Sequence, residues 1–238
     1  MPLRRHRKAF QLVEPIIEGE PDVWPAMGDP EKRGDAGAHN LPVKINGQSQ
    51  TEFIVDCLKR KGKCELLVLG PGLGRDLLWL HEDVSNRVGD ESQLKQFNID
   101  VLGLTKTIEP EVRGIVRNDY SGSKDKPVLF ENYENPDLIG RYDLSIAALS
   151  VGFYTRHPNL AVVKNADMLG IGGAGVMEIG FWGDTQPKTV RYKPEKILEE
   201  CNRFFRQKRP GKAFELDHQA LQEAPEHESH WYQIKRIK

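Results

Sequence analysis

The fold is decided by the stretch Leu66-Leu67-Val68-Leu69-Gly70-Pro71-Gly72-Leu73-Gly74-Arg75-Asp76. The apolar residues 66–69 predict a strand buried on both faces of a parallel sheet. The glycines at 70, 72 and 74 allow positive φ and let the backbone approach a ligand closely. A helix expected over residues 76–82 would point its free N–H groups at the same place. The stretch therefore predicts a strand, a glycine-rich turn and a helix start that hold a nucleotide-like cofactor.

The same glycines have a plainer interpretation, in which they only make a tight turn between a strand and a helix. The context favours a cofactor. A buried strand precedes the turn, a helix follows it, and a second strand is expected at 99–104, about 30 residues later, as in a dinucleotide-type unit.

Strands and helices alternate along most of the chain. Helices are expected over 51–61, 160–169 and 194–206, and strands over 128–130, 142–149 and 175–181. Two last strands, 213–221 and 230–237, are joined by a short polar loop and predict an antiparallel hairpin. The expected fold class is α/β, with a doubly wound, mostly parallel sheet closed by that hairpin. Residues 1–48, rich in Pro, Gly, Asp and Asn, predict an irregular N-terminal arm before a domain of residues 49–238.

Composition indicates an ordinary soluble globular protein, with 29% charged and 38% hydrophobic residues among 238. A net charge of -1 argues against a broadly basic surface for nucleic acid. No apolar run approaches the roughly 20 residues that span a bilayer, and no apolar stretch resembles a secretory signal. Cys57, Cys64 and Cys201 are widely spaced, which is typical of reduced thiols in the cytoplasm rather than of a disulfide framework or a zinc site.

Two classes of cofactor compete for the glycine-rich turn. A dehydrogenase fingerprint requires its third glycine one place further on, where Arg75 stands. It also requires an acid at the end of the second strand, and Leu104-Thr105-Lys106 offers none. Lys106 would suit a 2′-phosphate, so an NAD(P)-dependent oxidoreductase stays as an alternative, although a closing antiparallel hairpin is not typical of one.

From about residue 50 to 238 the order of elements resembles the class I (Rossmann-like) S-adenosylmethionine-dependent methyltransferases. In that family a helix precedes the glycine-rich motif, as 51–61 does here. The string Tyr142-Asp143-Leu144-Ser145-Ile146 is similar to the family's fourth strand, which commonly opens with an aromatic residue and an aspartate. The resemblance implies a seven-stranded sheet whose last strand is antiparallel, with S-adenosylmethionine as the cofactor.

The resemblance also implies which residues surround the cofactor. It assigns the methionine and ribose side to Gly70, Pro71, Gly72, Gly74 and Thr105, the adenine side to Asn132 and Tyr133, and the floor beneath the methyl group to the segment from Ala148 to Ser150. Two positions depart from the family. Val68 stands where an acid is frequent, and Thr105 stands where a carboxylate commonly binds the ribose. These departures favour, as an alternative, a binding or scaffold protein that keeps the fold without turnover.

The segment 150–158 occupies the place where the family binds its acceptor. Tyr154 and His157 could orient or deprotonate that acceptor; alternatively, they belong to a loop whose aromatic side chains pack inward and whose histidine is solvated. The segment lacks the Asn/Asp-Pro-Pro-aromatic signature of enzymes that methylate amino groups of nucleic acids, which argues against that subclass. Small molecules, proteins and RNA all stay as candidate acceptors.

Two further groups of residues have plain interpretations. His218, His227 and His230 match no standard zinc spacing and are expected on the surface of a hairpin, so no metal is expected. The basic stretch 203–212 is expected to be a solvated helix face, with an acidic partner as the minority interpretation.

Overall fold

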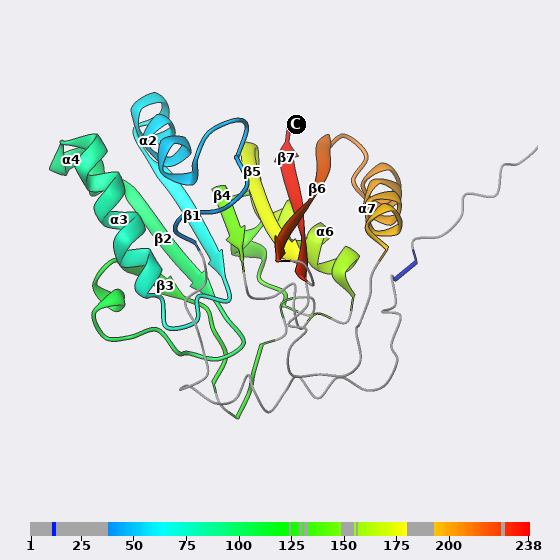
Figure 1. The fold of residues 1–238 in the computed structure, drawn as a ribbon, viewed down its shortest axis with the longest axis horizontal. Helices are drawn as coiled ribbons and strands as arrows, with labels where there is room; N and C mark the ends of the chain where they lie inside the picture. The colour runs from blue at the N-terminus through cyan, green and yellow to red at the C-terminus, as the bar shows by residue number, and fades with distance from the viewer. Residues whose placement is uncertain are drawn as a thin grey trace, which may run out of the picture.

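The computed structural model describes residues 11–12, 38–123, 125–128, 130, 133–148, 155, 157–179, 193–224 and 227–238 (Figure 1). A seven-stranded sheet runs through this part of the chain in the order β3-β2-β1-β4-β5-β7-β6. The strands are β1 (Cys64–Leu69), β2 (Phe97–Leu102), β3 (Val116–Asp119), β4 (Tyr142–Ala147), β5 (Leu169–Ile179), β6 (Phe214–Ala224) and β7 (His227–Arg236). The first five are parallel, and β7 is antiparallel to both β5 and β6. The predicted α/β class and its closing antiparallel hairpin are confirmed.

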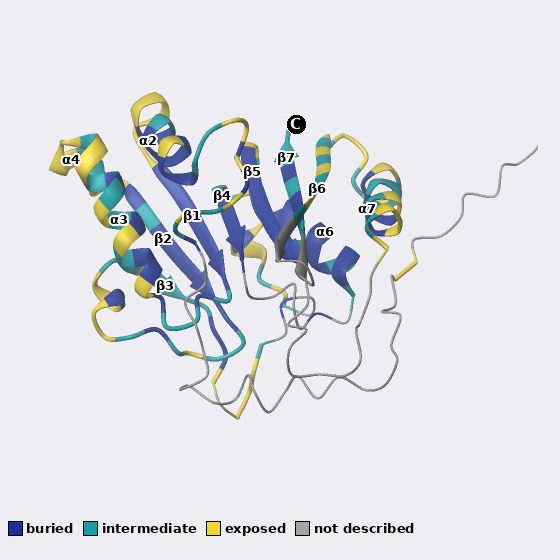
Figure 2. Cartoon of the chain, viewed as in Figure 1, coloured by how far each residue is buried: buried dark blue, intermediate teal, exposed yellow. Residues whose placement is uncertain are grey.

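Helices cover both faces of the sheet. The helices α2 (Gln50–Lys61), α3 (Arg75–Val88) and α4 (Glu91–Leu94) lie on one side in Figure 1, and α6 (Pro158–Met168) and α7 (Pro194–Lys208) lie on the other. All six residues of β1 are buried. Leu66 and Val68 belong to one hydrophobic cluster, and Leu67 and Leu69 to the other. This confirms the prediction of a strand buried on both faces, and Figure 2 shows the buried strands between partly exposed helices.

The helix before β1 begins and ends as its sequence predicts. Ser49 and Glu52 form a reciprocal capping box, in which each side chain accepts from the backbone N–H of the other residue. Gly62 ends the helix in the left-handed region, at φ 73°, and donates its N–H to the carbonyl of Leu58. The chain can therefore reverse at once into β1.

The third strand is Val116–Asp119, so the prediction of a strand at 128–130 was wrong. Val128 donates one backbone hydrogen bond to the carbonyl of Leu104, 2.8 Å away, but belongs to a loop. β3 is short and polar because it lies at the sheet edge, where ion pairs hold it. Arg117 donates to both carboxylate oxygens of Asp100, at 2.9 and 2.7 Å, and to Glu65 at 2.5 Å.

Asp100 is a fully buried carboxylate at the centre of this network. Burial alone would raise its pKa, but hydrogen bonds from Arg117, Asn118 and Tyr142 outweigh burial and hold the pKa below its ordinary range. Burial and the charge of Asp100 in turn raise the pKa of the Tyr142 hydroxyl. The network thus fastens β3 and β4 to β2 through one ionised group.

Some of the described residues before α2 belong to the core. Ala38, Val43 and Ile45 are buried in the same cluster as α2, and the N–H of Ala38 donates to Asp76 at the start of α3. Other element bounds differ modestly from expectation. β5 begins at Leu169 instead of 175, α3 continues to Val88, and the last two strands are longer than predicted.

Candidate functional site

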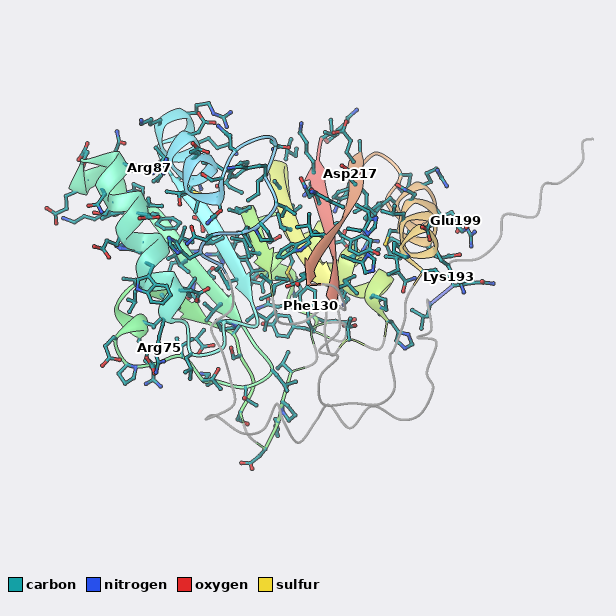
Figure 3. All side chains as sticks on the ribbon, viewed as in Figure 1. Arg75, Arg87, Phe130, Lys193, Glu199 and Asp217 are labelled. Atoms are coloured by element: carbon teal, nitrogen blue, oxygen red, sulfur yellow. The ribbon has the colours of Figure 1, made fainter. Side chains whose placement is uncertain are left out.

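The glycine-rich turn follows β1 directly and has the backbone its sequence requires. Gly70, Gly72 and Gly74 have φ angles of 67°, 58° and 81°, a region that L side chains rarely adopt. Gly74 is the N-cap of α3, which begins at Arg75, labelled in Figure 3. The strand order reverses between β1 and its neighbour β4. Open α/β sheets bind ligands in the crevice outside the carboxyl ends of the strands at such a switch point.

The ends of the second and third strands support the turn. A Cβ placed on Gly103, which follows β2, would lie 3.1 Å from Cδ of Pro71 and 3.2 Å from Oγ of Ser121. The N–H of Gly103 donates to Oγ of Ser121 at 2.8 Å. Both distances are tighter than most real Cβ contacts, so a side chain here would push Pro71 or Ser121 aside. Pro71, Gly103 and Ser121 are therefore brought together from three separate loops.

The segment after β2 is fastened onto the glycine-rich turn. Oγ1 of Thr107 donates to the carbonyl of Gly72 at 2.6 Å, and the N–H of Glu109 donates to the carbonyl of Leu73 at 3.0 Å. Arg75 forms two hydrogen bonds with the carboxylate of Glu109, which lower the pKa of that acid. Thr105 lies at the start of this segment and is partly exposed. Sequence reasoning placed Thr105 beside the turn but did not anticipate these bonds.

The prediction that Asn132 and Tyr133 lie near the adenine assumed a third strand at 128–130. The third strand is Val116–Asp119 instead. The residues that follow the observed β3 are Tyr120 and Ser121. The carbonyl of Tyr133 accepts from Nζ of Lys164 in α6 at 3.1 Å. Asn132 lies outside the described residues.

The carboxyl ends of β4 and β5 adjoin each other. Ala148, one residue beyond β4, is 2% exposed, and Glu178 near the end of β5 is 1% exposed. The register pairs Ala147 with Met177, so Ala148 and Glu178 are neighbours along this edge. Sequence reasoning missed Glu178, although an acid inside the apolar run 174–179 was a signal for it.

The predicted catalytic residues are described only in part. His157 is the N-cap of α6, and its N–H donates to Oγ1 of Thr155 at 3.3 Å. Tyr154 and Ser150 lie outside the described residues. Of the two predicted catalytic residues, His157 is therefore the one that the described residues include, at the start of α6.

The basic stretch 203–212 carries several internal ion pairs. Arg203 pairs with Glu199 and Glu200 of its own helix. Arg209 pairs with Asp167 of α6 through two hydrogen bonds, of 2.8 and 2.6 Å. These carboxylates offset much of the local positive charge.

On the hairpin, the rings of His218 and His230 contact each other, with Nε2 and Nδ1 3.1 Å apart.

Within the described residues, no helix is long and apolar enough to cross a membrane.

Comparison with known proteins gives structural likeness only. No protein-family model matches the chain, and no curated protein matches it in sequence. In structure it is similar to the 1,6-didemethyltoxoflavin-N1-methyltransferase of Burkholderia thailandensis, with 11% identity, a TM-score of 0.49, and coverage of 79% of this chain and 76% of that one.

Two further solved structures are similar to a comparable degree. The cyclase SpnF has 15% identity and a TM-score of 0.48, covering 89% of this chain and 91% of its own. A TehB-like SAM-dependent methyltransferase of Corynebacterium glutamicum has 15% identity and a TM-score of 0.44, covering 80% and 90%. The fold itself is decided by the strand order, in which the last strand of the chain, β7, is antiparallel and lies between β5 and β6, as the family resemblance predicts. On that topology, the chain has the class I methyltransferase fold.

Proposed function

We propose that the chain binds S-adenosylmethionine at the carboxyl edge between β1 and β4 and transfers its methyl group to an acceptor. The observation that carries the proposal is the left-handed glycine turn at the switch point of the sheet. The 14-residue helix α3 begins at the same place, and the N–H groups of its first turn favour a negatively charged group such as the carboxylate of the methionine portion.

In this proposal, different residues at this edge of the sheet contact different parts of the cofactor. Gly70, Pro71, Gly72 and Gly74 lie beside the methionine and ribose portions, and Thr105 contacts the ribose. Because Tyr120 and Ser121 follow the observed β3, they take the adenine side that was expected for Asn132 and Tyr133. This reassignment is supported by the hydrogen bond that ties Ser121 to Gly103 beside the turn.

S-adenosylmethionine supplies an electrophilic methyl group on its sulfonium sulfur. A lone pair of the acceptor forms the new bond to carbon, while sulfur keeps the electrons of the bond that breaks. Because this displacement is in line, the protein mainly positions the cofactor and the acceptor and excludes water. In this proposal, Ala148 and Ser150 lie beneath the methyl group, as the family resemblance implies. Tyr154 and His157 orient the acceptor or remove its proton.

A second candidate function is a binding protein that keeps the fold without turnover. Two hydrogen bonds within the chain favour it, from Thr107 to the carbonyl of Gly72 and from Glu109 to the carbonyl of Leu73. These bonds already occupy carbonyl groups of the turn. Thr105 also replaces a carboxylate, and a charge-assisted hydrogen bond is roughly twice as strong as a neutral one. In both candidates the acceptor or partner is a small molecule, a protein or RNA, and the compartment is the cytoplasm, which three free, buried cysteines support.

Calorimetric titration with S-adenosylhomocysteine tests the proposal. We expect saturable binding of one ligand per chain, and absence of binding at millimolar ligand overturns it. Gly72→Ala should weaken binding at least tenfold, because it adds a side chain in the turn. Gly89→Ala is the matched control, since Gly89 has a similar φ of 66° and a Cβ there meets nothing within 4 Å.

Turnover separates the two candidates. Transfer of labelled methyl groups to a fraction of a cell extract, lost in Gly72→Ala and kept in Gly89→Ala, supports the enzyme. Binding without any transfer supports the binding protein. Quenching of tryptophan fluorescence by a dinucleotide, but not by S-adenosylhomocysteine, supports the oxidoreductase alternative instead.

A further inference from the structure

Two cysteines and an aspartate meet at the amino ends of the central strands. Cys57 lies on α2, Cys64 is the first residue of β1, and Asp143 belongs to β4. The two sulfur atoms and a carboxylate oxygen all lie within 4.8 Å of one another. Cys57 is 1% exposed and Cys64 is fully buried, whereas the side chain of Asp143 is 13% exposed. We propose that Cys57, Cys64 and Asp143 bind one thiophilic divalent cation of the zinc type.

The local fold explains why these residues converge. The left-handed Gly62 ends α2 and returns the chain directly into β1, so Cys57 on the buried face of the helix stands over Cys64. β4 is the parallel neighbour of β1, and the N–H of Glu65 donates to Oδ2 of Asp143 at 3.0 Å. The six residues between the cysteines match no common zinc spacing. Sequence reasoning therefore treated them as unrelated thiols.

The donor set suits a soft cation in tetrahedral coordination. Thiolates select zinc and similar ions over magnesium and calcium, which prefer oxygen ligands. With Zn–S near 2.3 Å and Zn–O near 2.0 Å, ligand atoms around one ion lie about 3.5–3.8 Å apart. Small side-chain rotations would bring the three donors to that spacing. A water molecule would complete the set from the exposed side of Asp143.

The surroundings balance the charge of such a site. Two thiolates and one carboxylate around a divalent cation leave one negative charge. Lys61 supplies the compensating positive charge, since its Nζ lies 2.6 Å from Oδ1 of Asp143. The backbone N–H of Glu65 orients the same carboxylate, as hydrogen-bond donors behind the ligands commonly do at metal sites. The cluster is therefore neutral overall when the cation is bound.

The ion would brace the fold, and the proposed methyl transfer does not depend on it. Cys64 begins β1 and the glycine-rich turn follows its other end, so the two sites lie about 20 Å apart at roughly 3.3 Å per residue. A cation would tie α2 to both central strands. Since a ligand that binds only the folded state stabilises it, the metal should raise the thermal midpoint of unfolding.

Titration of the reduced full-length protein with Co²⁺ and Cd²⁺, followed by ultraviolet and visible absorption, tests the proposal. We expect thiolate-to-metal charge-transfer bands that saturate at one ion per chain and a raised thermal midpoint. Cys57→Ser and Cys64→Ser should abolish the bands, and Asp143→Asn should weaken binding at least tenfold. Cys201→Ser is the matched control, because Cys201 is equally buried but lies in α7, and it should retain the bands.

Several results would overturn the site. They are the absence of charge-transfer bands in the reduced wild-type protein, bands that persist in the Cys57→Ser/Cys64→Ser double variant, and bands lost in Cys201→Ser. Formation of a Cys57–Cys64 disulfide on treatment with oxidised glutathione, in a protein that takes up no metal when reduced, also overturns it. Folding of each variant is checked by circular dichroism and by S-adenosylhomocysteine binding, which should be unchanged.

Discussion

The buried ion network of β3 predicts a large loss of stability in Arg117→Met. Arg117 makes two hydrogen bonds to Asp100, which is fully buried, and a further ion pair with Glu65. The substitution keeps the apolar length of the side chain but removes the guanidinium. It therefore leaves a buried carboxylate without its main positive partner.

The magnitude follows from what remains around Asp100. Removing one partner of a buried ion pair costs about 3–5 kcal/mol. Asn118 and Tyr142 still donate to the carboxylate at 2.9 Å each, and Arg141 lies 3.5 Å away. These groups still partly stabilise the buried charge of Asp100, so we expect the free energy of unfolding to fall by about 3 kcal/mol, the low end of that range.

Urea unfolding, followed by circular dichroism, measures this loss as a lower midpoint at unchanged slope. Arg60→Met is the control, because Arg60 pairs with Asp56 on the surface of α2 with 61% of its side chain exposed, and it should cost below about 0.5 kcal/mol. In the double variant Asp100→Asn/Arg117→Met, most of the loss should be recovered. A loss below about 1 kcal/mol in Arg117→Met would refute the reasoning, as would equal losses in Arg117→Met and Arg60→Met.

Three further predictions concern stability. Gly122→Ala should destabilise the fold severely, because its Cβ would overlap the carbonyl oxygen of Lys126. A Cβ at Gly114 meets nothing within 4 Å, so Gly114→Ala should be neutral or slightly stabilising in the same urea assay. Ser49→Ala should cost about 1 kcal/mol and lower the thermal midpoint, because it removes the capping box of α2. Because the folded pKa of Asp100 is held below its ordinary 3.8, its contribution to stability should be complete above that pH and lost as pH falls further; a stability that stays flat below pH 3.8 would contradict this.

The central motif could be predicted from sequence because its physical signals are local. An apolar run of four residues requires burial on both faces, and glycines at alternate positions require a backbone that other residues avoid. The structure has both features in β1 and the turn after it. The capping residues Ser49 and Gly62 likewise act within one turn of helix, so the bounds of α2 were close to expectation.

The features that sequence reasoning missed depend on contacts between distant residues. β3 has one apolar residue and is held by Arg117 against Asp100, 17 positions away, so no local periodicity marks it. The residues that follow the third strand are therefore Tyr120 and Ser121, and not residues after 130 as the sequence predicted. Similarly, Cys57 and Cys64 meet Asp143 only because β4 lies beside β1.

The most direct measurement of the central claim is a crystal structure of the protein with S-adenosylhomocysteine. The account predicts the ligand in the crevice between the ends of β1 and β4, with its backbone contacts made by Gly70, Gly72 and Gly74 and its ribose beside Thr105. Ligand bound elsewhere, or no ligand in crystals grown at millimolar concentration with Thr107 still bonded to Gly72, would contradict it.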